Sequence, residues 1–163
     1  MRALAPIIAG IILTGCAKDL ASKFPGSWER MVAAKTAAAY RLRSGEFISG
    51  SVPLTAEQVL EVKSLLQDPK TYEPDRLKGC IPNPGVLIRF EGEGEKDADL
   101  ELCFECNVFI MHPREAGLGM GQVQNFDAAR PQFTRLVKAL FPKDKIIQGL
   151  SEDWPRVPRK SRS

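Results

Sequence analysis

Histidine, aromatic side chains and long apolar runs are all scarce in this chain of 163 residues, which has one histidine and 7% aromatic residues. The apolar run at residues 4–13 is too short for a transmembrane helix, which needs about 20 residues. Neither sign of charge predominates, since the chain has 23 basic and 20 acidic residues. A content of 44% hydrophobic and 26% charged residues is that of one globular domain, which excludes a disordered or low-complexity protein.

The small excess of positive charge lies at the C-terminal end. Residues 151–163 contain four basic and two acidic side chains, and Arg2 carries one more of the +3 net charges, so residues 16–150 are neutral overall. A nucleic-acid-binding domain has a clustered basic face, so no nucleic-acid partner is predicted. Pro155 and Pro158 oppose regular structure, and we expect residues 149–163 to be a basic disordered tail.

The N-terminus has the pattern of an export signal. Arg2 supplies a positive charge, residues 4–13 supply an apolar region, and polar residues follow from Lys18. This pattern predicts a secretory signal peptide.

Residues 13–16, Leu-Thr-Gly-Cys, resemble the lipobox of bacterial lipoproteins, in which an aliphatic residue and two small residues precede a cysteine. The resemblance implies that residues 1–15 are a lipoprotein signal peptide and that Cys16 becomes the acylated first residue. Several acyl chains attach a protein to a membrane lastingly. Ala17 resembles the residue that directs Gram-negative lipoproteins to the outer membrane, so we expect a lipid anchor there, facing the periplasm. A plain signal peptide with an incidental cysteine is the alternative.

The first half of the remaining chain predicts helices and short strands. Residues 16–26 are expected to be a tether, followed by a helix from Trp28, a strand near residues 38–43 and another at residues 47–52. Thr55 and Gln58 form a capping box, which predicts a helix that begins at Ala56 and ends at Pro69.

The second half predicts two strands and a helix. Apolar residues alternate from Val86 and again over residues 100–111, which we expect to be one long strand. The five carboxylates of residues 91–99 do not match an EF-hand loop and favour a solvated hairpin turn. Glycines at residues 117–121 predict a flexible connection between strand and helix, since they match no phosphate-binding motif. Asp127 is expected to cap a final helix that ends at Pro142.

These elements predict an α+β fold for residues 27–148, with a small antiparallel sheet and two amphipathic helices packed on one face. Parallel α/β winding is the alternative. The helix at residues 54–66, the segment from Cys80 to Phe90 and the Cys103-Phe-Glu-Cys106 sequence are similar to those of small bacterial envelope proteins of unknown function. That resemblance implies no particular activity.

Three cysteines besides Cys16 allow two kinds of chemistry. Cys103 and Cys106 form a C-x-x-C pattern, which is typical of redox pairs and of half zinc sites. In a straight strand these two side chains point to opposite faces, so a shared bond or metal would need a bulge. In an oxidising compartment we expect one structural disulfide, from Cys80 to Cys103 or Cys106, with the third thiol buried. A zinc site of Cys80, Cys103, Cys106 and His112 is the alternative.

No catalytic residues are predicted. Pro113 follows His112 and places it at a strand end, where a structural role is expected, and neither a G-x-S-x-G nor an H-E-x-x-H pattern occurs. The favoured interpretation is a membrane-anchored, non-catalytic binding or structural module without a cofactor, whose partner is an envelope protein or a cell-wall component. The alternative is a thiol–disulfide or zinc protein that uses the cysteines.

Overall fold

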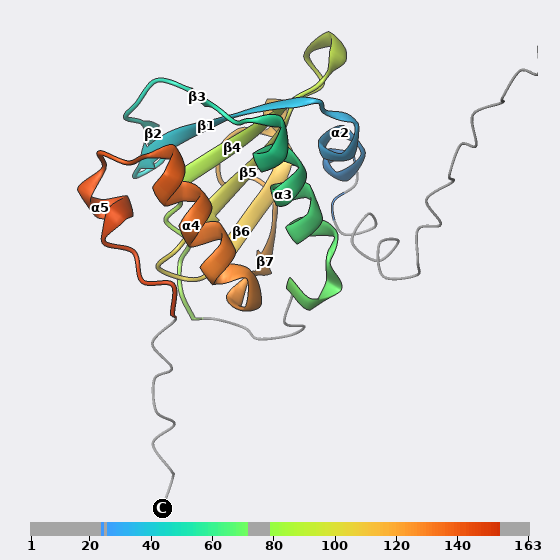
Figure 1. The fold of residues 1–163 in the computed structure, drawn as a ribbon. Coiled ribbons are helices and arrows are strands. Elements are labelled where there is room, and N and C mark those ends of the chain that lie inside the picture. Colours follow the sequence, from blue (N-terminus) through green and yellow to red (C-terminus); the bar gives the residue numbers. More distant parts are fainter. Residues whose placement is uncertain (1–23, 25, 72–78, 154–163) are drawn as a thin grey trace, which may run out of the picture.

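A computed structural model describes residue 24 and residues 26–71 and 79–153 (Figure 1). The fold is α+β, as the sequence predicts, with a seven-stranded sheet whose neighbouring strands are all antiparallel. The order is β2-β1-β4-β5-β6-β7, and β3 also pairs with β1. The strands are β1 (Thr36–Arg43), β2 (Glu46–Phe47), β3 (Val52–Pro53), β4 (Val86–Glu91), β5 (Ala98–Cys103), β6 (Val108–Pro113) and β7 (Gln122–Asn125).

Two amphipathic helices, α3 (Ala56–Gln67) and α4 (Arg130–Leu140), lie across one face of the sheet (Figure 1). Their apolar stripes join one core with the facing side chains of the strands. The described residues also form two shorter helices, α2 (Ser27–Ala33) and α5 (Lys145–Gln148), and 3-10 turns such as η2 (Glu93–Glu95), η3 (Arg114–Ala116) and η4 (Asp127–Ala129). Within the described residues, no helix is long and apolar enough to cross a bilayer.

The capping box at the start of α3 is confirmed. The Thr55 hydroxyl accepts a hydrogen bond from the Gln58 amide at 3.2 Å, and the Gln58 side chain accepts one from the Thr55 amide at 2.9 Å. The corresponding prediction for α4 is wrong, because Asp127 begins the 3-10 turn η4 and α4 starts at Arg130. The Asp127 carboxylate instead accepts a hydrogen bond from the Asn107 side chain at 2.8 Å.

The expected long strand at residues 100–111 is in fact a hairpin. β5 ends at Cys103, β6 begins at Val108, and these two residues are paired across the turn. Asn107 has a φ of 53°, a left-handed conformation that asparagine tolerates better than most residues and that lets the chain reverse. The reversal places Phe109 and Met111 in the core that faces the helices.

Three smaller expectations also change. The predicted strand at residues 47–52 is two short strands, β2 and β3. The glycine-rich residues 117–121 lead into another strand, β7, rather than into a helix. Phe24, placed in the tether by the sequence, is buried, and its ring centroid lies 5.7 Å from that of Phe109. The folded part of the described chain therefore begins before residue 27.

The C-terminal end of the described chain is also attached. Leu150 packs against the core, and the Ser151 carbonyl accepts a hydrogen bond at 3.0 Å from the buried guanidinium of Arg130. Residues 154–163, the rest of the expected tail, lie outside the described residues, as does Cys16.

All six residues of β5 are buried, although they alternate between the two faces of the sheet. Ala98, Leu100 and Leu102 face the helices as part of the core. On the outer face, the Asn83 amide donates a hydrogen bond to Cys103 and the Gly119 amide donates one to Glu101. The loops before β4 and after β6 therefore cover the outer face of β5.

Candidate functional site

The three cysteines of the folded domain gather at the end of the sheet where β5 turns into β6. Cys80 and Cys106 form a disulfide with their Cα atoms 5.9 Å apart, and Cys103 is a buried thiol. This is one of the two pairings that the sequence left open. The bridge ties the segment that leads into β4 to the turn between β5 and β6.

The hairpin turn removes the geometric objection to the C-x-x-C pattern, because Cys106 stands in the turn and not in a strand. Cys103 and Cys106 belong to the same small buried cluster, with Val108. The Cys103 sulfur accepts a hydrogen bond from the Asn83 amide at 3.3 Å. A free thiol therefore lies in the same cluster as one sulfur of the disulfide.

The four candidate zinc ligands are not brought together. Cys103 pairs with Val108 beside the turn, whereas His112 pairs with Asp99 at the opposite end of the same two strands. Two of the three thiols are also used in the disulfide. In the part of the chain that the structure describes, no three histidine, cysteine or acidic side chains are grouped as metal ligands.

His112 forms a buried pair with Glu101 on the outer face of the sheet. The His112 Nε2 and Glu101 Oε1 atoms are 2.7 Å apart, and the side chains are 1% and 2% exposed. The other ring nitrogen, Nδ1, lies 2.9 Å from the Pro113 carbonyl oxygen. The Pro113 carbonyl and the Glu101 side chain can both accept hydrogen bonds, so this environment favours a ring that donates from both nitrogens.

The pKa of His112 reflects opposing effects. Burial alone lowers the pKa, but the hydrogen bonds to Glu101 and Pro113 and the negative charges of Glu101 and Asp99 outweigh burial and hold it above its usual value. The same Glu101 oxygen accepts the Gly119 amide at 2.6 Å. The Glu101 side chain thus links the glycine-rich loop to the sheet, and His112 lies against the same oxygen.

A second charged group lies next to this pair. Asp99 accepts two hydrogen bonds from the Arg89 guanidinium, at 2.8 and 2.7 Å, and the guanidinium carbon stands 5.4 Å from the centre of the Tyr40 ring. Asp97 accepts hydrogen bonds from Arg114 at 2.9 Å and from the Gly92 amide at 3.2 Å. The β4–β5 connection is the expected hairpin, but its last two carboxylates, Asp97 and Asp99, are buried and paired with arginines.

Sequence reasoning missed Glu101, Arg89 and Asp99 as interacting residues. Alternation along a strand places Glu101 and Asp99 on one face. It does not say which residues of the next strand lie beside them until the position of the turn is known. Had Asn107 been recognised as the turning residue, the pairing of β5 with β6 would have brought His112 to the same face beside Glu101.

The comparisons with known proteins supply no relative for this site. No protein-family model matches the chain, and neither the curated proteins nor the solved structures include a match to it.

Proposed function

We propose that this chain is a lipid-anchored protein of the bacterial envelope whose domain is a non-catalytic binding module. The observation that carries the proposal is the Leu-Thr-Gly-Cys sequence at residues 13–16, which follows a short apolar run and precedes the folded domain by a few residues. Acylation at Cys16 would hold the domain at the outer membrane, facing the periplasm.

The Cys80–Cys106 disulfide supports export of the domain. Disulfides persist in oxidising compartments such as the periplasm and are rare in the cytosol. On the outer face Arg89 is paired with Asp99 and His112 with Glu101, and Glu101 also accepts the Gly119 amide, which favours a role in holding the strands and the glycine-rich loop in place. A partner in the envelope, either a protein or a cell-wall component, agrees with both observations.

Metabolic labelling in a Gram-negative host tests the anchor. Cells that express the full chain are grown with radioactive palmitate. The label is measured on the isolated chain, and the share of the chain in the membrane is measured after the cells are fractionated. We expect label in the wild-type chain and in Cys103→Ala, which keeps the motif, and none in Cys16→Ala. An unlabelled wild-type chain, or equal label in Cys16→Ala, would overturn the proposal.

A second candidate function, thiol–disulfide exchange, is favoured by the presence of Cys103 and Cys106 in one buried cluster. The Cys103 thiolate would attack the Cys106 sulfur, form a Cys103–Cys106 bond and release Cys80 as a thiolate, with no external oxidant. Cys80 is exposed and would then be the reactive thiol.

Peptide mapping separates the two candidates. The native full chain is incubated at pH 8 without reductant, alkylated under denaturing conditions and digested. A purely structural bridge gives Cys80–Cys106 with one alkylated thiol, at Cys103. Appearance of a Cys103–Cys106 peptide with alkylated Cys80 would support exchange.

A further inference from the structure

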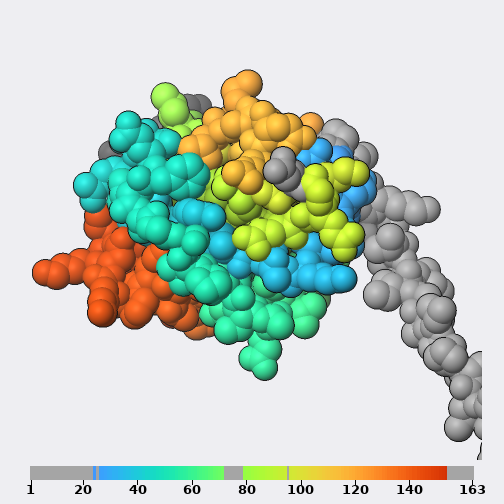
Figure 2. Space-filling model, turned by 90° about the horizontal axis from the view of Figure 1, so that it is seen from above, coloured from blue at the N-terminus to red at the C-terminus, as the bar shows by residue number. Residues whose placement is uncertain are grey.

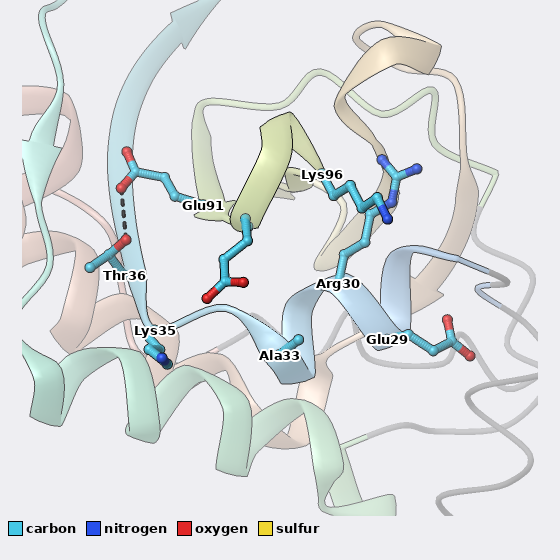
Figure 3. Close-up of a pocket in the computed structure, with 9 residues that line it drawn as sticks. Glu29, Arg30, Ala33, Lys35, Thr36, Glu91 and Lys96 are labelled. Carbon is cyan, nitrogen blue, oxygen red and sulfur yellow. Dashed lines mark hydrogen bonds between the residues drawn. The ribbon is translucent and has the colours of Figure 1, made fainter.

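The pocket of about 660 Å³ between α2, the start of β1 and the β4–β5 turn does not discriminate between ligands (Figure 3). In the view from above, the yellow-green β4–β5 turn lies beside the blue segment of α2 and β1 (Figure 2). The charged side chains that line the pocket are three carboxylates and three cations, namely Glu29, Glu91, Glu93, Arg30, Lys35 and Lys96. Because the two signs balance, charge favours neither an acidic nor a basic ligand. The three cysteines of the folded domain are more specific, because only one of their possible pairings is present.

The disulfide skips the cysteine that lies between its two ends in the sequence. Cys103 follows Cys80 and precedes Cys106 by three positions, yet the bridge joins Cys80 to Cys106. A chain that is exported from its N-terminus presents Cys80 first, then Cys103 and only then Cys106. Each of the two wrong pairs therefore joins cysteines that are consecutive in the exported domain, and the native pair does not.

The wrong pair Cys103–Cys106 is the one that the unfolded chain closes most easily. Its loop is far shorter than the sequence separation of 26 residues in the native bridge, and the entropy lost on closing a flexible loop grows with its length. The β5–β6 hairpin also brings Cys103 and Cys106 close through local pairing alone. Hairpins form within about 1–10 μs, before contacts between distant segments. Cys80, in contrast, meets Cys106 only when the segment before β4 has packed against this turn.

Burial determines how readily a wrong pair is corrected. Cys103 and Cys106 are both buried, whereas Cys80 is exposed. A Cys103–Cys106 bond inside a formed hairpin would be shielded from attack by thiolates, and access is one of the factors that set the rate of disulfide exchange. The same bond would leave Cys80 as an exposed free thiol. Correction therefore needs a thiol that reaches the turn before the domain has closed over it.

We infer that the domain is a substrate of a thiol–disulfide isomerase, which converts a Cys103–Cys106 isomer into the native Cys80–Cys106 bridge. The thiolate of the isomerase attacks the Cys106 sulfur and releases Cys103 as a thiolate, which takes up a proton. Cys80 then loses its proton, attacks the Cys106 sulfur and releases the thiolate of the isomerase. The number of disulfides stays the same, so the step consumes no oxidant or reductant. The inference rests on the proposed export, which places the chain in an oxidising compartment.

Oxidative refolding tests the order of pairing. The full chain with Cys16→Ala has only the three cysteines of the domain. This chain is reduced and unfolded in urea, then diluted in mild detergent into oxidised glutathione, with or without reduced glutathione. Samples are quenched with acid at intervals, and their disulfides are identified by peptide mapping. We expect Cys103–Cys106 to form first and to persist without reduced glutathione, and reduced glutathione to speed its conversion to Cys80–Cys106 several-fold.

Cys103→Ala in the same background is the matched control. It keeps both ends of the native bridge and removes the competing thiol, so it should form Cys80–Cys106 directly, at a rate that reduced glutathione does not raise. A first bridge other than Cys103–Cys106 in the three-cysteine chain would overturn the inference. An equal effect of reduced glutathione on the two chains would do the same.

Expression in a Gram-negative host tests the isomerase itself. In cells that lack the periplasmic disulfide isomerase, the share of the chain with the Cys80–Cys106 bridge should fall several-fold, while that of Cys103→Ala should not change. Equal shares of native bridge with and without the isomerase would refute this partner. Neither refolding nor palmitate labelling depends on the other, so a labelled chain that pairs natively without help would refute the isomerase alone, and an unlabelled chain that refolds as expected would refute the anchor alone.

Discussion

At the scale of single residues, the outer face carries buried charged side chains whose pairing affects stability. Glu101 and His112 are nearly inaccessible to water, and taking two charges out of water costs free energy that only close pairing and further hydrogen bonds recover. The Gly119 amide and the Pro113 carbonyl supply those further bonds. Removing one partner alone would leave the other charge buried without compensation.

We expect the stability of the protein to fall as pH rises above neutrality. The pKa of His112 is higher in the folded chain than the unfolded value of about 6.5, so its contribution is fully present below about pH 6.5 and is lost as pH rises through the folded pKa. Urea unfolding at a series of pH values from 6 to 9 measures this effect. His112 is the one histidine of the chain, so His112→Gln should remove most of the slope in that interval.

Titration of the His112 ring by NMR provides a measurement that does not depend on the variant folding. A pKa above that of an unfolded histidine is expected in the wild-type chain. A pKa below about 6.5 would contradict the assignment of an imidazolium beside Glu101.

At the scale of elements, the start of α3 is held by a local device. The reciprocal hydrogen bonds of Thr55 and Gln58 satisfy two amides that a helix start leaves without partners. We expect Thr55→Ala to lower the free energy of unfolding by about 1 kcal/mol, measured by urea denaturation. Thr55→Ser keeps the hydroxyl and is the matched control; equal losses in both variants would show that the cap contributes little.

The start of β7 depends on close contact with β6. A Cβ atom at Gly121 would lie 2.6 Å from the Met111 carbonyl oxygen and 2.9 Å from a methyl group of Ile110. Gly121→Ala therefore forces β7 away from β6, and we expect a loss of about 1–3 kcal/mol in unfolding free energy. Gly50→Ala is the control, because nothing lies within 4 Å of a Cβ atom there. Similar stabilities of the two variants would contradict this reading of the contact.

The elements also show where sequence reasoning succeeds. The α3 helix follows from residues adjacent in the chain, so its start could be predicted to the residue. The turn between β5 and β6 could not, because Phe104, Glu105 and Cys106 include neither glycine nor proline and only Asn107 favours a reversal. Without the turn, the side chains of β6 were assigned to the wrong faces of the sheet. The contact between Glu101 and His112 could therefore not be predicted. The cysteines could be named from the sequence, whereas their pairing required the fold.

At the scale of the whole molecule, the sheet and the disulfide act together. Most paired strands are neighbours in the sequence, and the longest connection within the sheet, from β3 through α3 to β4, ends in the segment that Cys80 fastens. The bridge closes a loop with a sequence separation of 26 residues, which limits the freedom of the unfolded chain.

We expect replacement of both bridged cysteines, Cys80→Ala with Cys106→Ala, to lower the free energy of unfolding by about 3 kcal/mol. Urea denaturation of the full chain measures the change. Cys103→Ala keeps the bridge and removes a buried sulfur. The smaller loss of unfolding free energy expected for this variant measures the effect of packing alone. A double variant no less stable than Cys103→Ala would mean that the bridge does not constrain the unfolded chain.

With the proposed lipid anchor at Cys16, burial of Phe24 would limit the distance between the domain and the membrane. Phe24 follows Cys16 by eight positions, and a fully extended chain of that length spans at most about 28 Å. This segment is shorter than the thickness of a bilayer with its headgroups, which is about 40–45 Å. A domain anchored at Cys16 would therefore stay close to the membrane surface. A partner would have to come close to that surface to bind the domain.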